Sequence, residues 1–243
     1  MRYKCIVSYD GYNYKGFQVQ PGEVTIEICL KEAIKMMLHK DVKIYPAGRT
    51  DAMVHAIGQV IHFDLDLNIK PEAIKNGLNS FLPRDIRIVD ASIVDESFHA
   101  RFSAKKKEYH YLVKQREPSV FENRYMAYYK NLDIDLMNEA LRMLCGKHNF
   151  KGFCSGSVNP LKDFEKTIYE AKIIKDGDYL RFIFIGSGFL KYQIRRMMGL
   201  VLEIGAKRDS LETITRVFNE RDPGISHKIA PGYGLYLMKV YYD

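Results

Sequence analysis

Four polar side chains that could take part in chemistry occur in one short stretch of the sequence, between residues 47 and 58. They are Arg49, Thr50, Asp51 and His55, and apolar segments flank the stretch on both sides. A carboxylate such as that of Asp51 can attack a carbon centre, accept a proton or stabilise a positive charge. Asp and Thr also cap turns, because their side chains bond readily to nearby backbone. This stretch alone therefore leaves a catalytic loop and an ordinary turn both open.

The spacing of apolar residues predicts the elements that would position this stretch. Strict alternation of apolar and polar residues is typical of a strand, and apolar residues at steps of three and four are typical of an amphipathic helix. In the first half of the chain these patterns predict strands over residues 1–9, 42–46, 59–65 and 86–93, and helices over 25–39 and 71–81. The polar stretch is therefore expected to be a loop that joins two strands.

The second half of the chain has a similar mixture of strands and helices. The predicted strands are 107–114, 167–175, 179–187 and 235–242, and the predicted helices are 135–144, 189–204 and 210–219. Asp176 and Gly177 form a typical hairpin turn, so the strands on either side of it should be antiparallel neighbours. We therefore expect an α+β fold of two similar domains, residues 1–102 and 103–243, each a mostly antiparallel sheet with flanking helices.

The composition favours a globular protein with an anionic partner. The chain has 243 residues, and 37 Lys and Arg against 30 Asp and Glu give it a net charge of +7. Such an excess favours a polyanion, although many basic proteins bind no nucleic acid. The four cysteines form no C-x-x-C pair, and the sequence has neither a signal-peptide core nor an apolar stretch of membrane-spanning length. A cytoplasmic protein without a structural metal is expected.

Five separated motifs then occur along the chain. They are Tyr9-Asp10-Gly11 with Tyr14-Lys15-Gly16-Phe17-Gln18, Gly48-Arg49-Thr50-Asp51-Ala52 with Val54-His55-Ala56, Phe98-His99-Ala100-Arg101-Phe102 leading to Tyr109-His110-Tyr111, Gly188-Phe189-Leu190 with Ile194-Arg195-Arg196 and Gly199, and Ala230-Pro231 with Gly234-Leu235-Tyr236-Leu237. Together, and in this order, they resemble the bacterial tRNA pseudouridine synthases of the TruA family. The resemblance extends over almost the whole chain.

The resemblance implies specific roles for four residues. Asp51 is similar to the essential aspartate of the family, Tyr109 to the aromatic residue that lies on the target uracil, and Arg195 to the arginine that pairs with the aspartate. Arg49 matches the residue proposed in the family to help displace the target base. The implied fold has two domains that meet at a central basic cleft.

The implied reaction is the isomerisation of uridine to pseudouridine in the anticodon stem-loop of tRNA, at positions 38, 39 and 40. Uracil leaves C1′ through N1, turns and rejoins through C5, so no external reactant, cofactor or metal is required. Ionised Asp51 can attack the sugar, stabilise positive charge there or remove the C2′ proton, and the sequence leaves these roles open. The resemblance also implies a homodimer in which one tRNA touches both subunits.

Met53 is the one departure from the family pattern in the catalytic loop, where glycine usually follows Asp-Ala. Glycine permits backbone angles that methionine adopts only at a cost. The carboxylate is unaffected by this change, whereas the shape of the loop, and with it the choice of RNA, is open to change. Another RNA, such as ribosomal RNA, is therefore the alternative substrate.

Basic residues near the motifs are candidates for phosphate contacts, because Lys and Arg neutralise phosphates when proteins bind nucleic acids. Arg196 follows Arg195, and a run of three lysines precedes Tyr109, namely Lys105, Lys106 and Lys107. A solvated surface would carry the same charges. Tyr109 likewise fits an ordinary strand, where aromatic residues are favoured, or a stacking contact on the uracil.

Arg49 and two histidines also have two interpretations. The planar cation of Arg49 suits the space left by a displaced base or a phosphate, and it equally suits an ion pair with Asp10 or Asp51. His55 and His99 are expected to be structural, because no step of the reaction needs an imidazole.

Two other classes of protein fit parts of the pattern. A non-catalytic RNA-binding module would carry the same basic charge and the same aromatic residues on strands. A hydrolase that uses Asp51 as its nucleophile would need a positioned water and usually a metal or a second carboxylate, and the sequence shows no such ligand cluster. Release of tritium from C5-labelled uridine distinguishes the isomerase from both.

Overall fold

The computed structural model describes residues 1–154, 163–225 and 228–243, and in it the chain forms two compact units. Unit 1 comprises residues 1–105 and 236–243, and unit 2 comprises residues 106–235. The expected division after residue 102 is close to the change of unit after residue 105. The last strand differs from the expectation, because residues 236–243 group with unit 1 and not with the second domain.

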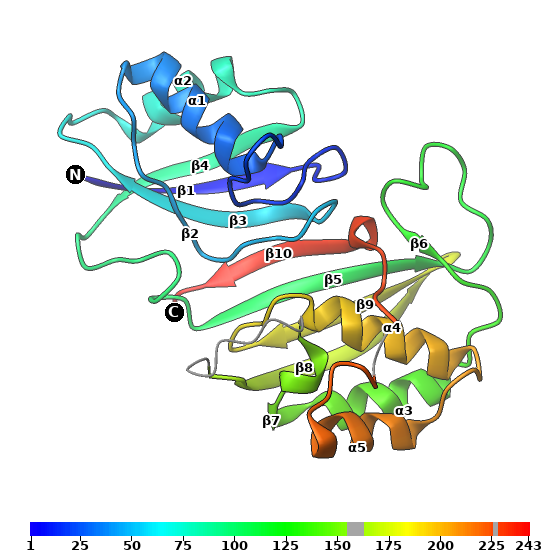
Figure 1. Ribbon diagram of the computed structural model, residues 1–243. Helices are drawn as coiled ribbons and strands as arrows, with labels where there is room; N and C mark the ends of the chain where they lie inside the picture. The colour runs from blue at the N-terminus through cyan, green and yellow to red at the C-terminus, as the bar shows by residue number, and fades with distance from the viewer. Residues whose placement is uncertain (155–162, 226–227) are drawn as a thin grey trace. The chain divides into compact units, whose positions relative to one another are not determined.

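Unit 1 is built on a sheet in which most neighbouring strands are antiparallel. Its strands are β1 (Arg2–Tyr9), β2 (Tyr45–Pro46), β3 (His55–Asp64), β4 (Ile86–Val94) and β10 (Leu235–Tyr241). The order is β4-β1-β3-β10, and β2 pairs with β3 (Figure 1). β1 is antiparallel to β3 and β4, whereas β10 is parallel to β3, with Tyr236 opposite His55. The C-terminal strand therefore extends the sheet that carries the polar loop.

Two helices cover one face of this sheet, and their ends follow from the sequence. Thr25 caps α1 (Ile26–Leu38) by accepting a hydrogen bond from the Ile28 amide, as N-cap threonines do. Pro71 begins α2 (Pro71–Phe81), a position where its missing amide proton is not needed. The helices bury their apolar residues, and Tyr3, Cys5 and Phe63 of the strands are fully buried. Burial of this apolar face stabilises unit 1.

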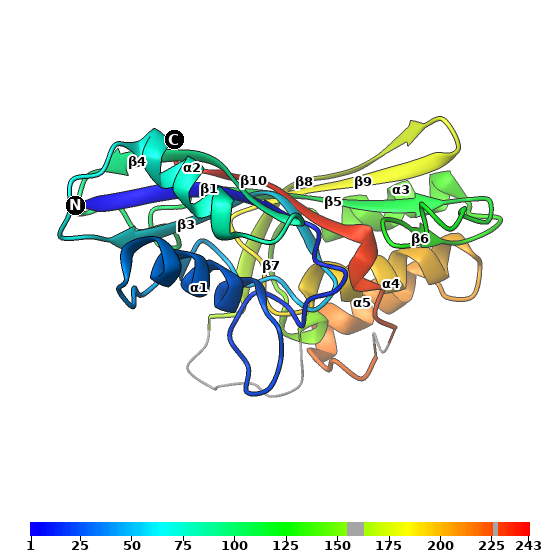
Figure 2. The same cartoon turned by 90° about the horizontal axis from the view of Figure 1, so that it is seen from above.

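The described residues of unit 2 form a sheet of their own and three α-helices. The strands are β5 (Lys106–Lys114), β6 (Ala127–Tyr128), β7 (Gly146–Asn149), β8 (Glu165–Asp176) and β9 (Tyr179–Gly186), in the antiparallel order β5-β9-β8-β7 with β6 parallel to β5. The helices are α3 (Ile134–Leu144), α4 (Gln193–Gly205) and α5 (Leu211–Glu220), with short 3₁₀ turns at Lys151–Phe153 and Gly232–Gly234. Figure 2 shows the three helices on one side of this sheet.

These observations confirm the expected α+β class, and the start of β3 is the main correction to the predicted elements. The strand begins at His55 and not at residue 59, so the polar loop covers only residues 47–54. Gly58 had marked the expected end of the loop. A Cβ atom at Gly58 would lie 2.4 Å from the Met238 carbonyl oxygen, so this glycine permits the close approach of β10 within the strand.

The start of α4 is a second correction. Residues 189–192 were expected to be helical, but the helix begins at Gln193. Tyr192 has a φ of 65°, which lies in the left-handed region, and the Gln193 side chain accepts a hydrogen bond from the Leu190 amide. These local contacts replace the first helical turn. The short strands β6 and β7 were not predicted, and of the expected strand 42–46 only residues 45–46 form a strand, β2.

None of the helices in the described ranges combines the length and the apolar character that crossing a membrane requires.

Candidate active site

Asp51 begins a tight turn at the end of the loop that leads into β3. The Val54 amide donates a hydrogen bond of 3.2 Å to the Asp51 carbonyl, which closes the turn over Ala52 and Met53. Met53 has a φ of 65°, a backbone angle that glycine adopts at the third position of such turns without cost. Met53, which replaces the glycine usual in the family, therefore has a left-handed backbone conformation. Asp51 itself is half-buried.

The first motif packs directly on the backbone of this turn. A Cβ atom at Gly16, whose φ is 93°, would lie 2.8 Å from the Thr50 carbonyl oxygen and 3.2 Å from the Asp51 carbonyl carbon. A Cβ at Gly11 would lie 1.9 Å from the Val54 carbonyl oxygen. The Met53 amide donates to the Tyr14 carbonyl at 3.2 Å. Two glycines of the first motif thus allow two backbone segments to meet around Asp51.

Side chains of β1 and β3 hold the other half of the loop. The Thr50 hydroxyl lies 2.8 Å from the Tyr9 hydroxyl, and the Gln59 amide donates to the Gly48 carbonyl at 2.7 Å. Burial raises the pKa of Tyr9 to about 12, so its hydroxyl stays protonated at neutral pH and remains available for this bond. Thr50, Tyr9 and Gln59 are all buried. The loop is therefore fixed on both sides of Asp51.

His55 is part of the framework of this loop. It is buried at the first position of β3, and its Nδ1 lies 3.0 Å from an Asp10 carboxylate oxygen and 3.2 Å from the Gly11 amide nitrogen. Its ring stacks on that of Tyr236 with centroids 4.6 Å apart. These contacts fit the structural role expected for His55. They also bring the first, second and C-terminal motifs together in unit 1.

Tyr109 lies in β5 of unit 2 and is 8% exposed. Its ring meets the ring of Phe189 edge-on, with centroids 5.3 Å apart. Phe189 also packs over Gly186 at the end of β9, where a Cβ would lie 2.9 Å from its ring. Phe189 thus links the strand of Tyr109 to the segment that leads into α4, the helix of Arg195. The motif Gly188-Phe189-Leu190 is the sequence signal for this contact, but the motif alone did not predict a role for Phe189.

Arg195 is half-buried in the first turn of α4 and is held by the segment around Ala230. Its Nε donates to the Ala230 carbonyl at 2.8 Å, and the Ala230 amide donates to the Arg195 carbonyl at 2.9 Å. The guanidinium also lies over the Tyr192 ring at 5.2 Å from its centroid. A Cβ at Gly199 would meet the Lys228 carbonyl oxygen at 2.4 Å, so this glycine permits the close approach. The direction of the Arg195 side chain is therefore well defined.

The candidate phosphate contacts differ in exposure. Arg49 and Lys105 are exposed, and Lys106, Lys107 and Arg196 are half-buried. Arg196 donates to the Pro223 carbonyl at 2.8 Å, which ties it to its own unit. No carboxylate of the described residues forms an ion pair with Arg49, so the alternative pairing with Asp10 or Asp51 is not observed.

The sequence-predicted residues thus divide between the units, with Asp51 and Arg49 in unit 1 and Tyr109 and Arg195 in unit 2. Sequence reasoning did not single out Tyr9, Thr50 and Gln59 as supports of the Asp51 loop, although the first two lie within its motifs. Gln59 carried no signal beyond its place in a predicted strand. Within the ranges 1–154, 163–225 and 228–243, no group of three or more His, Cys, Asp or Glu is arranged to hold a metal ion.

Comparisons with known proteins extend over the whole chain. The family described as tRNA pseudouridine synthase matches residues 5–103 and 140–243. The chain is 45% identical over 246 residues to the tRNA pseudouridine synthase A of Geobacillus sp. (strain WCH70), covering 100% of this chain and 98% of that protein. It is 41% identical over 248 residues to the tRNA pseudouridine synthase A of Bacillus subtilis (strain 168), covering 100% of both. A solved structure described as a Cbf5-Nop10-Gar1 complex matches 82% of this chain and 54% of that chain, at 12% identity and a TM-score of 0.36.

Proposed function

The chain belongs to the tRNA pseudouridine synthase family, and we propose that Asp51 is the carboxylate with which it isomerises uridine in the anticodon stem-loop of tRNA. It is an enzyme of the isomerase class, a pseudouridine synthase. The observation that carries the assignment of Asp51 is the construction of its loop. Three motifs far apart in sequence meet around this turn, and two glycines allow backbone to approach backbone there. Fixed geometry of this kind is what catalytic positioning requires.

Asp51 has to be ionised to act on the ribose, whichever of its three chemical roles it takes. Enclosing a carboxylate beneath a base disfavours its charged form, and a nearby cation offsets that effect. We assign the cation to Arg195, whose guanidinium is oriented by the Ala230 carbonyl. At about 4 Å and an effective dielectric of 20, such a pair attracts by roughly 4 kcal/mol. This attraction favours the carboxylate over the protonated acid.

Tyr109 is proposed to stack on the target uracil after the base has left the RNA helix. Extrusion of a base costs a few kcal/mol, and stacking on an aromatic side chain returns about 1–3 kcal/mol per base. The edge-on contact with Phe189 fixes the plane of the Tyr109 ring before substrate binds. The tyrosine hydroxyl is a candidate for removing the C5 proton. Arg49, exposed in the same loop as Asp51, is proposed to occupy the space that the base leaves.

The target positions, the oligomeric state and the cellular location are also part of this proposal. The target positions are 38, 39 and 40 of tRNA, the active form is a homodimer in which one tRNA touches both subunits, and the protein acts in the cytoplasm without a cofactor. The family resemblance supports these features. Lys105, Lys106, Lys107 and Arg196 are proposed phosphate contacts, of which Lys105 is exposed. The left-handed Met53 supports the alternative of another RNA as substrate, because it changes the side chain presented beside Asp51.

The substrate is tested by incubating the purified protein with an unmodified tRNA transcript and with a ribosomal RNA transcript, and mapping pseudouridine chemically in each. Pseudouridine at positions 38–40 of tRNA is the expected product. The same map is then made for RNA from a strain that lacks the gene. Unchanged positions 38–40 in that strain, with loss of a ribosomal site, would overturn the tRNA assignment and favour the alternative.

A further inference from the structure

The motif Phe98-His99-Ala100-Arg101-Phe102 has no role in the chemistry proposed above. Its segment lies in unit 1 across the face of the sheet that carries Lys4 and His62, opposite to the face that α1 and α2 cover. The Ala100 amide donates to Nδ1 of His62 at 3.1 Å, and the Tyr242 hydroxyl donates to the Ala100 carbonyl at 2.8 Å. The position of the motif on the sheet is therefore fixed by hydrogen bonds.

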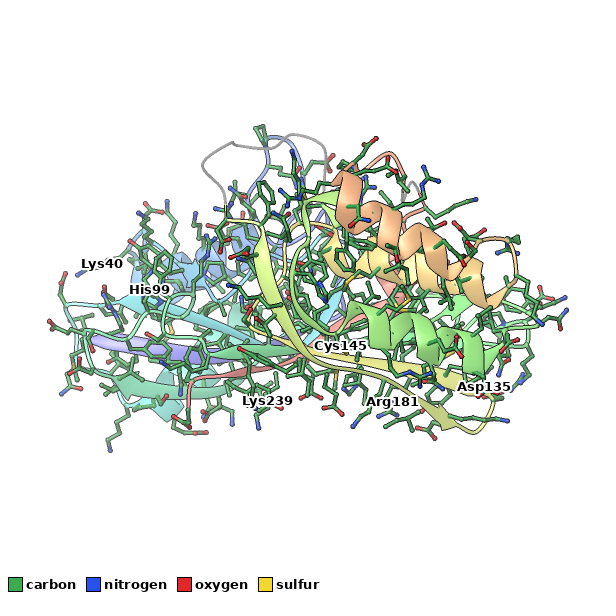
Figure 3. The ribbon with its side chains drawn as sticks, turned by 90° about the horizontal axis from the view of Figure 1, so that it is seen from below. Lys40, His99, Asp135, Cys145, Arg181 and Lys239 are labelled. Atoms are coloured by element: carbon green, nitrogen blue, oxygen red, sulfur yellow. The ribbon has the colours of Figure 1, made fainter. Side chains whose placement is uncertain are left out.

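A series of aromatic rings leads from the sheet to the surface through this motif. Tyr45 stacks on His62 with centroids 4.8 Å apart, His62 meets His99 at 4.7 Å, and His99 meets Phe102 at 4.4 Å. His62 is buried, whereas Phe102, the last ring, is 76% exposed. His99, labelled in Figure 3, lies in the middle of the series. The series therefore ends in an exposed aromatic ring that packs on the ring of His99.

Cations accompany these rings. The Lys43 ammonium lies 4.9 Å from the Tyr45 centroid, the Arg101 guanidinium 5.6 Å from that of Phe102, and the Lys4 ammonium 5.8 Å from that of Phe98. None of these three cations forms an ion pair with a carboxylate of the residues that the structure describes. Their charge is therefore available to an anionic partner.

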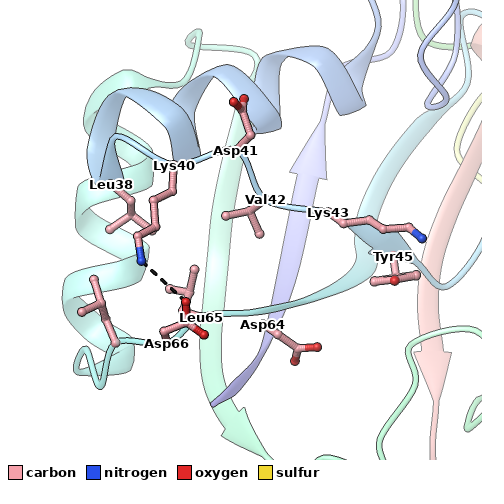
Figure 4. Close-up of a pocket in the computed structure, with 10 residues that line it drawn as sticks. Leu38, Lys40, Asp41, Val42, Lys43, Tyr45, Asp64, Leu65 and Asp66 are labelled. Atoms are coloured by element: carbon pink, nitrogen blue, oxygen red, sulfur yellow. Dashed lines mark ion pairs between the residues drawn. The ribbon is translucent and has the colours of Figure 1, made fainter.

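A hollow of about 210 Å³ adjoins the series and is lined in part by Lys43 and Tyr45 (Figure 4). Three carboxylates also line it, and each has a cationic partner: Asp41 pairs with Lys35, Asp64 with Arg2, and Asp66 with Lys40. Figure 4 shows the Lys40–Asp66 pair as a dashed line. Each of these carboxylates therefore has a cation beside it, whereas Lys43 forms no ion pair with a carboxylate of the described residues.

The surface is separate from the Asp51 loop. His62 lies seven residues along β3 from His55, which adjoins that loop. At about 3.3 Å per residue the two ends of this stretch of strand are roughly 23 Å apart. A ligand that reaches both places has to be large, as a folded RNA is.

We propose that Phe102, Arg101 and Lys43 form a second RNA contact, in which an unpaired base of the substrate tRNA stacks on Phe102 and the two cations bind flanking phosphates. The inference rests on the proposed function. An exposed aromatic ring bordered by cations is the arrangement that single-stranded and loop nucleotides recognise, because every base offers a stacking face beside its phosphate. A protein partner would instead require a contiguous apolar patch, whereas here a single exposed ring is bordered by charge.

The test is the affinity for tRNA of Phe102→Ala and Arg101→Ala, each compared with a matched variant elsewhere. Phe121→Ala removes a ring that is 84% exposed in unit 2, and Arg84→Ala removes an exposed arginine in unit 1. We expect Phe102→Ala to weaken binding about tenfold, as loss of one stacked base does. Arg101→Ala should reduce the slope of log affinity against log salt by about one. Both control variants should bind as the wild type does.

Other outcomes would overturn the inference. Unchanged affinity of Phe102→Ala, in a wild type that binds and converts tRNA, contradicts it while leaving the proposed function intact. Equal weakening by Phe121→Ala also contradicts it. A change in sedimentation of Phe102→Ala with unchanged tRNA affinity would assign the surface to a second copy of the chain. A wild type that neither binds nor converts tRNA removes the proposed function itself. Phe102→Tyr, which keeps the ring, should retain wild-type affinity, and turnover at saturating tRNA should be unchanged in the control variants Phe121→Ala and Arg84→Ala.

Discussion

Met53 is the residue at which the sequence and the backbone disagree most clearly. Its φ of 65° lies where an L side chain is disfavoured by roughly 1–2 kcal/mol, and glycine carries no such cost. The surrounding contacts impose this angle, since the Met53 amide bonds to the Tyr14 carbonyl and the Val54 amide closes the turn to Asp51. The loop around Asp51 therefore contains a residue whose backbone conformation is unfavourable for an L side chain.

This conformation predicts a reversed order of stability for two substitutions of Met53. At ordinary positions alanine is more stabilising than glycine, because glycine loses more backbone freedom on folding. At Met53 we expect the Gly variant to exceed the Ala variant by about 1 kcal/mol in the free energy of unfolding. Denaturant titration of both proteins measures this difference. Ala52→Gly, one residue earlier at a negative φ, is the control and should be destabilised. An Ala variant at Met53 as stable as the Gly variant would contradict the account.

The segment of residues 10–24 packs on the backbone of the Asp51 loop. Gly16 and Gly22 lie in it, and both have positive φ. They differ in their surroundings, because a Cβ at Gly16 would press on the Thr50 and Asp51 backbone, whereas a Cβ at Gly22 would meet nothing within 4 Å. Alanine substitutions at Gly16 and Gly22 therefore distinguish the effect of backbone strain from the effect of displacing Asp51.

We expect Gly16→Ala to lower turnover by about a hundredfold, since a displacement of about 1 Å at a catalytic group has an effect of that size. Gly22→Ala should cost about 1 kcal/mol of stability and leave turnover near that of the wild type. Steady-state pseudouridine formation measures the first effect, and thermal unfolding confirms that both proteins are folded. Equal turnover in the two variants would show that the contact with the Asp51 loop is unimportant.

The elements that were predicted correctly are those with local signals. α2 spans residues 71–81, as Pro71 and the helical spacing indicated, and Asp176-Gly177 joins β8 and β9 as a hairpin. The start of β3 could not be predicted, because Gly58 is explained by β10, which is distant in sequence. β10 groups with unit 1 because it pairs with β3, which is also distant from it in sequence. Long-range backbone contacts thus account for the principal errors.

The residues of the candidate site also differ in whether a local sequence pattern identified them. Asp51, Tyr109 and Arg195 could be selected because each lies in a recognisable motif. The supports of the Asp51 loop could not all be selected, since Gln59 acts through a buried hydrogen bond to the Gly48 carbonyl that leaves no pattern in the sequence. The left-handed angle at Met53 was anticipated in part, from the glycine that the family usually has there.

For the whole molecule, the stability of unit 1 should depend on pH through His62. Burial lowers the pKa of this imidazole to about 4, from 6.5 in the unfolded chain, and its Nδ1 accepts a hydrogen bond from the Ala100 amide only when unprotonated. Because the folded pKa is depressed, the stabilisation is present above pH 6.5 and is lost as the pH falls toward 4. The folded state is thus favoured when His62 is neutral.

We expect the free energy of unfolding of the wild type to fall by about 2 kcal/mol more between pH 7 and pH 4.5 than that of His62→Gln. Glutamine keeps an acceptor for the Ala100 amide but does not titrate. His39→Gln, at an exposed site, is the control and should follow the wild type. Denaturant titrations at the two pH values measure the difference. Parallel curves for the wild type and His62→Gln would contradict the assignment.

We expect this chain to isomerise uridine through the carboxylate of Asp51. The release of tritium from tRNA that carries C5-labelled uridine measures this reaction, with wild type and Asp51→Asn compared at equal folded concentration and equal tRNA binding. The wild type should release tritium and form pseudouridine, and Asp51→Asn should do neither. Release by Asp51→Asn at the wild-type rate, or a wild type that binds tRNA and releases no tritium, would contradict it.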